Sequence, residues 1–271
     1  MIDVDVKNIM NSLLLKKAEI MRTEESIPLK DGSWEFTFLI HSYESDYNSR
    51  AALPALFRFM QEAAWQHAAY YHIGYDDLIR DDLVWVLAGI TIKLSEIPRW
   101  DDVIKLRTWA RGTDRLFALR DFTFHNQKGD QIAAAHSNWL VVNMKTKRPQ
   151  RLDPFLGKMP LIERQALEES FHTIENFMPP ELLEKRSVRV SDVDVYGHMN
   201  NTRYIEWIID TYAFPQYKNM NIRLAEVHFL KEALPDTTLS IWKQQKEDML
   251  YFAIKDKFGK VEHCRIIMKI N

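Results

Sequence analysis

Two stretches of the chain place apolar residues three and four positions apart, which is the period of an amphipathic helix. The first spans residues 51–71, and the second spans residues 199–212. In the first stretch, the positions at this spacing are Leu53, Leu56, Phe57, Met60, Ala64 and His67. The pattern therefore predicts one long helix in each half of the chain.

Alternating apolar and polar residues follow each of these helical stretches, and this alternation predicts strands. Residues 103–109 and 238–242 are such runs. Residues 121–124 lead through a turn that ends at Gly129 into residues 132–142, and residues 251–254 lead through Gly259 into residues 261–270. Two strands joined by a short turn that contains glycine predict a hairpin. Each half is thus expected to be a helix followed by antiparallel strands.

The two halves are related by an internal repeat. Residues 87–92, Leu-Ala-Gly-Ile-Thr-Ile, align with residues 224–229, Leu-Ala-Glu-Val-His-Phe. Pro98 aligns with Pro235 at the same offset of 137 residues. We therefore predict an α+β fold in which each half is a long helix wrapped by a curved antiparallel sheet. The two sheets can pair edge to edge, which leaves few bare edges.

The repeat also predicts how the chain is divided. Residues 26–143 form the first unit and residues 186–271 the second, with a linker at 144–185 and an N-terminal extension at 1–25. The linker contains five prolines and a stretch around residues 161–170 that is predicted to be helical. In the extension, residues 11–22 form the only predicted helix, which is too short a segment for a helix-turn-helix.

Composition narrows the class of protein. Hydrophobic residues make up 46% of the chain and charged residues 27%, the balance of a globular protein. No apolar stretch is long enough to span a membrane, and the N-terminus lacks the pattern of a secretory signal, so we expect a cytoplasmic protein. A net charge of -2 gives no general attraction to nucleic acid. Cys264 is the only cysteine, which excludes an intramolecular disulfide and predicts a buried, inert thiol in the strand at 262–270.

The least ordinary segment of the chain is residues 189–204. A strand ends in acidic residues, Gly197 permits a tight turn, and Asn200 and Asn201 precede an apolar helix. Free N–H groups at a helix start favour an anion or a polarised carbonyl oxygen, and Asp194 and His198 supply a carboxylate and an imidazole nearby. Each residue alone also suits a cap or a turn. Their combination predicts a site that attacks a carbonyl group.

The pattern Asp-x-Asp-x-x-Gly-His-x-Asn-Asn-x-x-Tyr at residues 192–204 resembles the signature of hotdog acyl-thioester hydrolases. The wider chain resembles the plant and bacterial acyl-ACP thioesterases. This likeness covers most of residues 35–271, and it includes residues 41–44, 56–67, 83–86, 98–103, 137–139 and 229–233. The resemblance implies a tandem, or double, hotdog fold. The first hotdog would hold the acyl chain and the second would carry the catalytic residues.

The same resemblance implies roles for individual residues. Asp194 and His198 match catalytic positions of the family, and Glu232 matches its acidic residue on the neighbouring strand. Tyr196 stands where the plant enzymes carry Asn, and Ala233 stands where they carry Cys, so a thiol nucleophile is impossible at that place.

These residues suggest a mechanism without a thiol. We expect Asp194 or Glu232, held near His198, to activate water as a general base. The N–H groups from Met199 to Asn201 would stabilise the oxyanion, so Asn200 and Asn201 complete the predicted catalytic set. Direct attack by Asp194 remains an alternative.

Further residues are candidates for binding. Gln61, Glu62 and Trp65 on the first helix, together with Tyr196, are predicted to contact the substrate. The first half has Arg50 near the place of the histidine, so one active site per chain is expected. An acyl carrier protein is acidic, and the densest basic run that could receive it consists of Lys145, Lys147, Arg148 and Arg151. A second basic set consists of Arg107, Arg111, Arg115 and Arg120.

The sequence thus favours an acyl-ACP thioesterase of fatty acid biosynthesis that uses no cofactor and has no metal site. An acyl-CoA thioesterase of the same fold, a non-catalytic acyl-thioester-binding regulator and a hotdog dehydratase are the alternatives. Acyl carrier protein is the expected partner, nucleic acid is not expected, and the resemblance suggests a homodimer.

Overall fold

The computed structural model describes residues 26–168 and 180–271. In these ranges, eleven strands form one antiparallel sheet in the order β1-β2-β4-β5-β6-β3-β8-β11-β10-β9-β7. The strands are β1 (Ser26–Pro28), β2 (Trp34–Leu39), β3 (Leu83–Leu94), β4 (Val103–Asp114), β5 (Phe117–His125), β6 (Gln131–Asn143), β7 (Glu181–Ser187), β8 (Ile222–Phe229), β9 (Thr238–Lys246), β10 (Met249–Asp256) and β11 (Glu262–Ile270).

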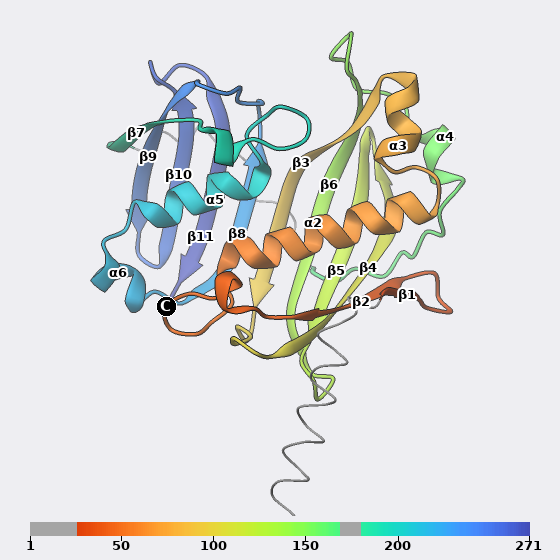
Figure 1. Ribbon diagram of the computed structural model, residues 1–271, viewed down its shortest axis with the longest axis horizontal. Coiled ribbons are helices and arrows are strands. Elements are labelled where there is room, and N and C mark those ends of the chain that lie inside the picture. Colours follow the sequence, from red (N-terminus) through yellow and green to blue (C-terminus); the bar gives the residue numbers. More distant parts are fainter. Residues whose placement is uncertain (1–25, 169–179) are drawn as a thin grey trace, which may run out of the picture.

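Two helices lie across the same face of this sheet, one in each half (Figure 1). They are α2 (Leu53–Tyr70) and α5 (Asn201–Asp210), so both long helices predicted from apolar spacing are confirmed. The shorter helical elements are η1 (Ser42–Glu44), α3 (Tyr75–Leu78), η2 (Ile79–Asp81), α4 (Asp153–Leu156), η3 (Val190–Asp192) and α6 (Phe214–Lys218). The predicted hairpins are β5–β6 and β10–β11, and both are also confirmed.

The two halves join through β3 and β8, which pair antiparallel at the centre of the sheet. Ile90 is directly paired with Val227, and these two residues are also equivalent in the repeat of 137 residues. A local twofold axis therefore passes between them. This pairing confirms the predicted edge-to-edge contact of the two sheets.

One cluster of buried side chains extends through both halves. Leu56 and Met60 of α2 are fully buried against the first part of the sheet, and Ile205 and Ile208 of α5 are fully buried against the second. Burial of each such side chain contributes roughly 1.5–3 kcal/mol. The helix faces that bear these residues are thus fixed on the sheet, and the helix start that carries the candidate site is fixed with them.

Part of the linker differs from the prediction. Residues 161–168 contain no helix, so the predicted helix at 161–170 is wrong over its described part. Leu161 instead forms a parallel bridge with Ala110 of β4, and the Nε1–H of Trp109 donates to the carbonyl of Arg164 at 2.8 Å. These contacts tie the backbone of the segment to β4.

Three further expectations concern the end of the linker, the N-terminal extension and membrane-spanning segments. The predicted boundary between residues 185 and 186 falls inside β7. The predicted helix at residues 11–22 lies outside the described residues. Within the described ranges, no helix is both long enough and apolar enough to cross a membrane.

Candidate active site

The site is organised by a tight turn from Asp194 to His198. Oδ1 of Asp194 accepts hydrogen bonds from the backbone N–H groups of Tyr196 at 2.9 Å and His198 at 3.4 Å. Gly197 has a φ of +77°, a left-handed conformation that glycine adopts at low cost. These contacts fix the carboxylate, while its Oδ2 has no hydrogen-bond partner among the described residues.

The first half contains the same turn with different chemistry. Oδ1 of Asp46 accepts hydrogen bonds from the backbone N–H groups of Asn48 and Arg50, as Asp194 does in the second half. Oδ2 of Asp46 is occupied, because the Arg50 guanidinium donates to it from Nε at 3.0 Å and from a terminal nitrogen at 2.8 Å. The repeat therefore extends to the backbone of the site, but the carboxylate of the first turn is neutralised.

Glu232 completes the acidic part of the site. Its Oε2 lies 3.2 Å from Nε2 of His198, and its Oε1 accepts a hydrogen bond from Nζ of Lys147 at 3.3 Å. Glu232 lies in the loop after β8 and not on the strand where it was predicted. Nδ1 of His263 on β11 lies 3.1 Å from the carbonyl oxygen of Glu232, which ties this loop to the sheet.

The start of α5 narrows the predicted set of oxyanion donors. The N–H of Met199 donates to Ala233 at 2.9 Å, and that of Asn200 donates to Asp192 at 2.8 Å, so both are already engaged. The N–H of Asn201 has no acceptor among the described residues. It is therefore the donor of this group that is available to a substrate carbonyl.

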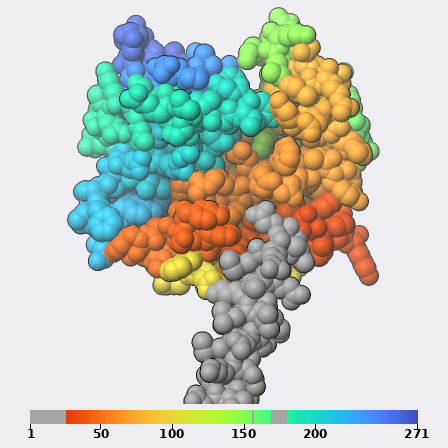
Figure 2. Space-filling model, viewed as in Figure 1, coloured from red at the N-terminus to blue at the C-terminus, as the bar shows by residue number. Residues whose placement is uncertain are grey.

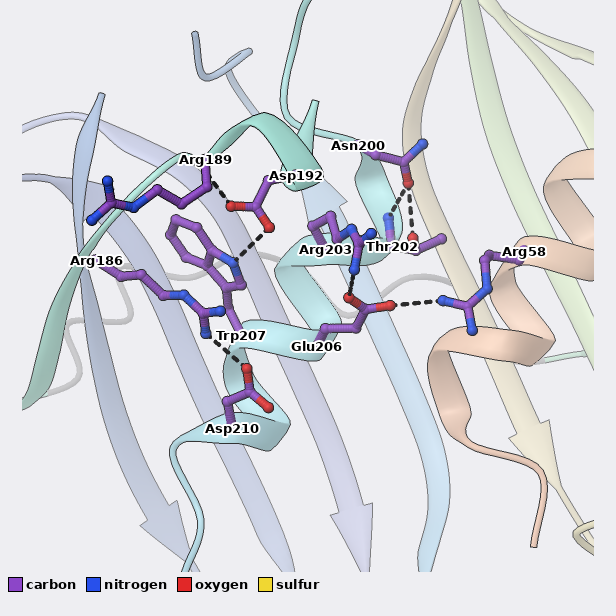
Figure 3. A network of polar contacts seen from close by, with 10 residues as sticks. All are labelled: Arg58, Arg186, Arg189, Asp192, Asn200, Thr202, Arg203, Glu206, Trp207 and Asp210. Atoms are coloured by element: carbon purple, nitrogen blue, oxygen red, sulfur yellow. Dashed lines mark hydrogen bonds and ion pairs between the residues drawn. The ribbon is translucent and has the colours of Figure 1, made fainter. Parts of the chain in front are cut away.

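Asn200 serves as the N-cap of α5. Its side-chain oxygen accepts hydrogen bonds from the backbone N–H of Thr202 at 2.9 Å and from the Thr202 hydroxyl at 2.8 Å (Figure 3). This carboxamide oxygen is turned toward the helix, and Asn200 does not line the cavity described below. Asn200, which was predicted as part of the catalytic set, thus stabilises the end of the helix that presents Asn201.

A polar network holds the segment before this turn and joins the halves (Figure 3). Asp192 accepts hydrogen bonds from the backbone of Arg189 at 2.9 Å and from Nε1 of Trp207 at 3.3 Å. Glu206 of α5 accepts one from Arg58 of α2 at 2.7 Å. The segment that leads into the turn is therefore anchored on α5, and α5 is anchored on the helix of the other half.

A cavity of about 850 Å³ opens at this turn. Asp194, Tyr196, His198, Asn201 and Glu232 line it, as do Gln61, Glu62 and Trp65 of α2. The part of the cavity within the first half is lined mainly by apolar residues, including Ile73, Leu78, Trp85, Ala110, Trp139 and Phe155. In Figure 2, the surface is hollowed between the orange region of the first half and the teal region of the second. The cavity thus joins the polar turn to a long apolar space.

Aromatic residues at the cavity were only partly anticipated. The Tyr196 ring meets the Tyr75 ring edge to face, with centroids 5.3 Å apart. Burial, together with the nearby Tyr75 and Asp194, raises the pKa of Tyr196 to about 12, so its phenol stays protonated at neutral pH. Sequence reasoning missed Tyr75, because α3 belongs to the other half and carries no motif. Tyr204 also lines the cavity, and its place in the signature was the one signal for it.

Cys264 and the potential metal ligands bear on two other kinds of chemistry, thiol and metal chemistry. Cys264 is fully buried, and burial raises the pKa of its thiol, so the predicted buried thiol is confirmed. Within residues 26–168 and 180–271, no group of three or more His, Cys, Asp or Glu side chains is arranged to hold a metal ion.

The basic residues divide into three kinds. Lys145 pairs with Asp82 at 2.5 Å, and Lys147 pairs with Glu232 inside the site. Arg148 and Arg151 follow Lys147 in the chain, and both are exposed. Arg120, which was predicted as part of a second basic set, is only 8% exposed and therefore cannot contribute to a docking surface.

Comparison with protein families gives two matches. The acyl-ACP thioesterase N-terminal domain matches residues 32–156, and the acyl-ACP thioesterase C-terminal domain matches residues 180–269. Among curated proteins, an oleoyl-acyl carrier protein thioesterase of Arabidopsis thaliana is 27% identical over 202 residues, which are 68% of this chain and 55% of that protein. A palmitoyl-acyl carrier protein thioesterase of Gossypium hirsutum is 23% identical over 74% of this chain and 52% of its own length. The chain thus spans about half the length of these relatives.

Solved structures agree over nearly the whole described chain. An acyl-ACP thioesterase from Bacteroides thetaiotaomicron has a TM-score of 0.82 and 25% identity, with 89% of this chain and 99% of that chain covered. The 12:0-ACP thioesterase from Umbellularia californica has a TM-score of 0.79 and 20% identity, with 90% and 99% covered. These likenesses confirm the predicted double hotdog fold.

Proposed function

The chain belongs to the acyl-ACP thioesterase family, and we propose that it hydrolyses fatty acyl-ACP to free fatty acid and acyl carrier protein in fatty acid biosynthesis. One observation carries this proposal: Asp194, His198 and Glu232 line the polar end of a cavity whose remaining wall is largely apolar. Such a space suits an acyl chain whose thioester lies at the polar end. The family supports the reaction class, and the geometry supports the position of the substrate.

The proposed reaction adds water to the thioester carbon and breaks the carbon–sulfur bond. The N–H of Asn201 donates to the carbonyl oxygen as its negative charge develops, a contribution of about 10²- to 10³-fold per donor. A carboxylate of Asp194 or Glu232 takes the proton of the attacking water, and the proton passes to the thiolate of the leaving carrier. In the alternative route, Oδ2 of Asp194 attacks the thioester and water hydrolyses the resulting anhydride.

Rival functions share the same cavity and differ in carrier or in chemistry. An acyl-CoA thioesterase would use the same residues with another carrier, and a non-catalytic regulator would bind the acyl thioester without hydrolysis. Hydrolysis of acyl-ACPs from eight to eighteen carbons, assayed beside the matching acyl-CoAs, decides among them. We expect acyl-ACP to be hydrolysed with the higher kcat/KM. Equal or better hydrolysis of acyl-CoA would contradict the carrier assignment, and binding without turnover would contradict the enzyme assignment.

We also propose that the acidic carrier docks beside the cavity on the exposed residues Arg148 and Arg151. Reversal of both charges to Glu is expected to raise KM for acyl-ACP severalfold and to leave KM for a short acyl-pantetheine unchanged, because only the carrier protein meets these charges. Steady-state kinetics with both substrates measure this. Lys128→Glu is a control at an exposed basic residue outside both basic sets. Lys147 is unsuitable, because it contacts Glu232.

A cytoplasmic location and a homodimer are further parts of the proposal, and both rest on the sequence and on the family resemblance alone. Light scattering of the purified chain during size-exclusion chromatography tests the dimer, and a monomer at micromolar concentration would contradict it. Fractionation of the source cells tests the location.

A further inference from the structure

Arg120 on β5 points toward α2 and lines the cavity, although its side chain is almost entirely buried. One terminal nitrogen donates to Nδ1 of His67 on α2 at 2.8 Å and to the hydroxyl of Thr108 at 3.0 Å. The other lies 3.9 Å from the sulfur of Met159, which is a weak acceptor. Arginine has five N–H donors in all, so most of this guanidinium lacks a strong acceptor.

The charge of Arg120 has no counter-ion in the described parts of the chain, since no carboxylate lies within ion-pair distance of it. Burial lowers the pKa of Arg120 to about 10, which leaves it cationic at neutral pH. Burial and the neighbouring Arg120 lower the pKa of His67 to about 2, so the imidazole is neutral, and its Nδ1 gives Arg120 an acceptor but no counter-charge. A buried cation is costly unless acceptors surround it. This one faces a cavity whose nearby wall is apolar.

The strand order places Arg120 far from the catalytic turn. Glu232 follows the end of β8, and the strands β8, β3, β6 and β5 lie side by side in that order. In register, His228 is level with Gly89, Asn138 and Leu119, the residue before Arg120. Three strand intervals correspond to roughly 14 Å across the sheet, and the four residues from His228 to Glu232 add up to about 13 Å along it. Glu232 and Arg120 are thus separated by roughly 14–19 Å, the length of an extended chain of about twelve to sixteen carbons. An acyl chain that enters at Glu232 therefore brings its far end to Arg120.

We propose that Arg120 forms a polar subsite at the far end of the acyl cavity, which binds an oxygen acceptor at the distal end of a medium-length acyl chain. The substrate class is then an acyl thioester whose chain ends in a hydroxyl or a carboxylate. The protein accepts it in addition to, or in preference to, the thioester of a plain hydrocarbon chain. The oxygen accepts from the guanidinium N–H groups that the protein leaves without a strong acceptor. A carboxylate also supplies the missing counter-charge, and hydrogen bonds between ions are the stronger kind. This inference rests on the proposed function only in taking the ligand to be an acyl chain.

The first test uses the wild-type full-length chain without any substitution. Calorimetric titration compares three methyl esters of equal length, at twelve and at sixteen carbons: the plain alkanoate, the ω-hydroxyalkanoate and the monoester of the dioic acid. The ester blocks the carboxylate of the plain chain, which could otherwise bind Arg120 itself. In a wholly apolar slot, an added hydroxyl weakens binding by about tenfold or more, because it loses its water and gains no partner. We expect instead that, at one of these lengths, both esters with a distal oxygen bind at least as tightly as the plain ester. Binding of the plain ester tenfold tighter than both at each length would overturn the proposal.

A second test measures specificity in the matching acyl-ACPs. We expect Arg120→Met to lower the kcat/KM ratio of the ω-hydroxyacyl-ACP to the plain acyl-ACP by about tenfold or more at the chain length favoured in the first test. Leu78→Met, which alters another apolar residue of the cavity wall, should leave this ratio unchanged. The ratio cancels any common loss of active protein, and an unaltered ratio in a folded Arg120→Met variant would overturn the subsite. Preferential binding of the esters with a distal oxygen, without hydrolysis of any thioester, would keep the subsite and contradict the proposed function.

Discussion

Substitution of Asp194 by Asn is expected to lower kcat for acyl-ACP by about 10²- to 10⁴-fold, the range for removal of a general base, while the protein stays folded. Asn retains a side-chain oxygen that can accept the backbone hydrogen bonds from Tyr196 and His198, so the turn keeps its shape. The substitution replaces Oδ2, which has no partner within the described residues, by an amide nitrogen that has neither the charge nor the basicity of a carboxylate oxygen. Single-turnover kinetics with acyl-ACP measure the loss, and circular dichroism checks the fold.

The repeat supplies a matched control. Asp46 occupies the equivalent turn in the first half and makes the same backbone hydrogen bonds, so Asp46→Asn is expected to leave kcat unchanged. An Asp194→Asn variant with normal kcat would refute the assignment of this turn as the catalytic one. Labelled oxygen in the Asp194 carboxylate after a single turnover in isotopically labelled water would demonstrate the anhydride route, because general-base catalysis never places the oxygen of water there.

Much of the fold could be predicted because the information is periodic and duplicated. Apolar spacing in α2 and α5 predicts both long helices, and the offset between the halves identifies β3 and β8 as equivalent strands. The helix predicted at residues 161–170 was wrong over 161–168, because contacts with Trp109 and Ala110 on β4 outweigh local propensity. Local sequence does not contain such contacts between distant segments.

The site was predicted where its residues are adjacent in sequence and less well where the fold brings them together. Asp194, His198 and Asn201 belong to one short motif, and all three line the cavity. Asn200 has the residue type of a catalytic amide as well as of a cap, and only the hydrogen bonds with Thr202 separate the two roles. Lys147 looked like one more charge in a basic run. Its contact with Glu232 depends on two loops from different halves.

Substitution of Glu232 by Gln is expected to lower kcat by about 10²-fold or more, since it removes the carboxylate that contacts Nε2 of His198. If Glu232 and Asp194 act on the same water, the loss in the double variant Asp194→Asn/Glu232→Gln will be well below the product of the two single losses, because residues that act as a unit are not additive. Pre-steady-state hydrolysis by the two single variants and the double variant gives this comparison.

Loss of the ion pair between Glu232 and Lys147 is another explanation for a lower kcat in Glu232→Gln. Lys147→Met distinguishes this explanation from loss of the carboxylate beside His198. Both groups of the pair are substantially exposed, with Lys147 at 62% and Glu232 at 46% of the side chain, and exposed pairs contribute little to stability. Lys147→Met removes the pair but leaves the carboxylate beside His198, so kcat should fall far less than in Glu232→Gln. If the two variants lose kcat equally, Glu232 acts through its contact with Lys147. If Glu232→Gln retains full kcat, Asp194 and His198 perform the hydrolysis without it.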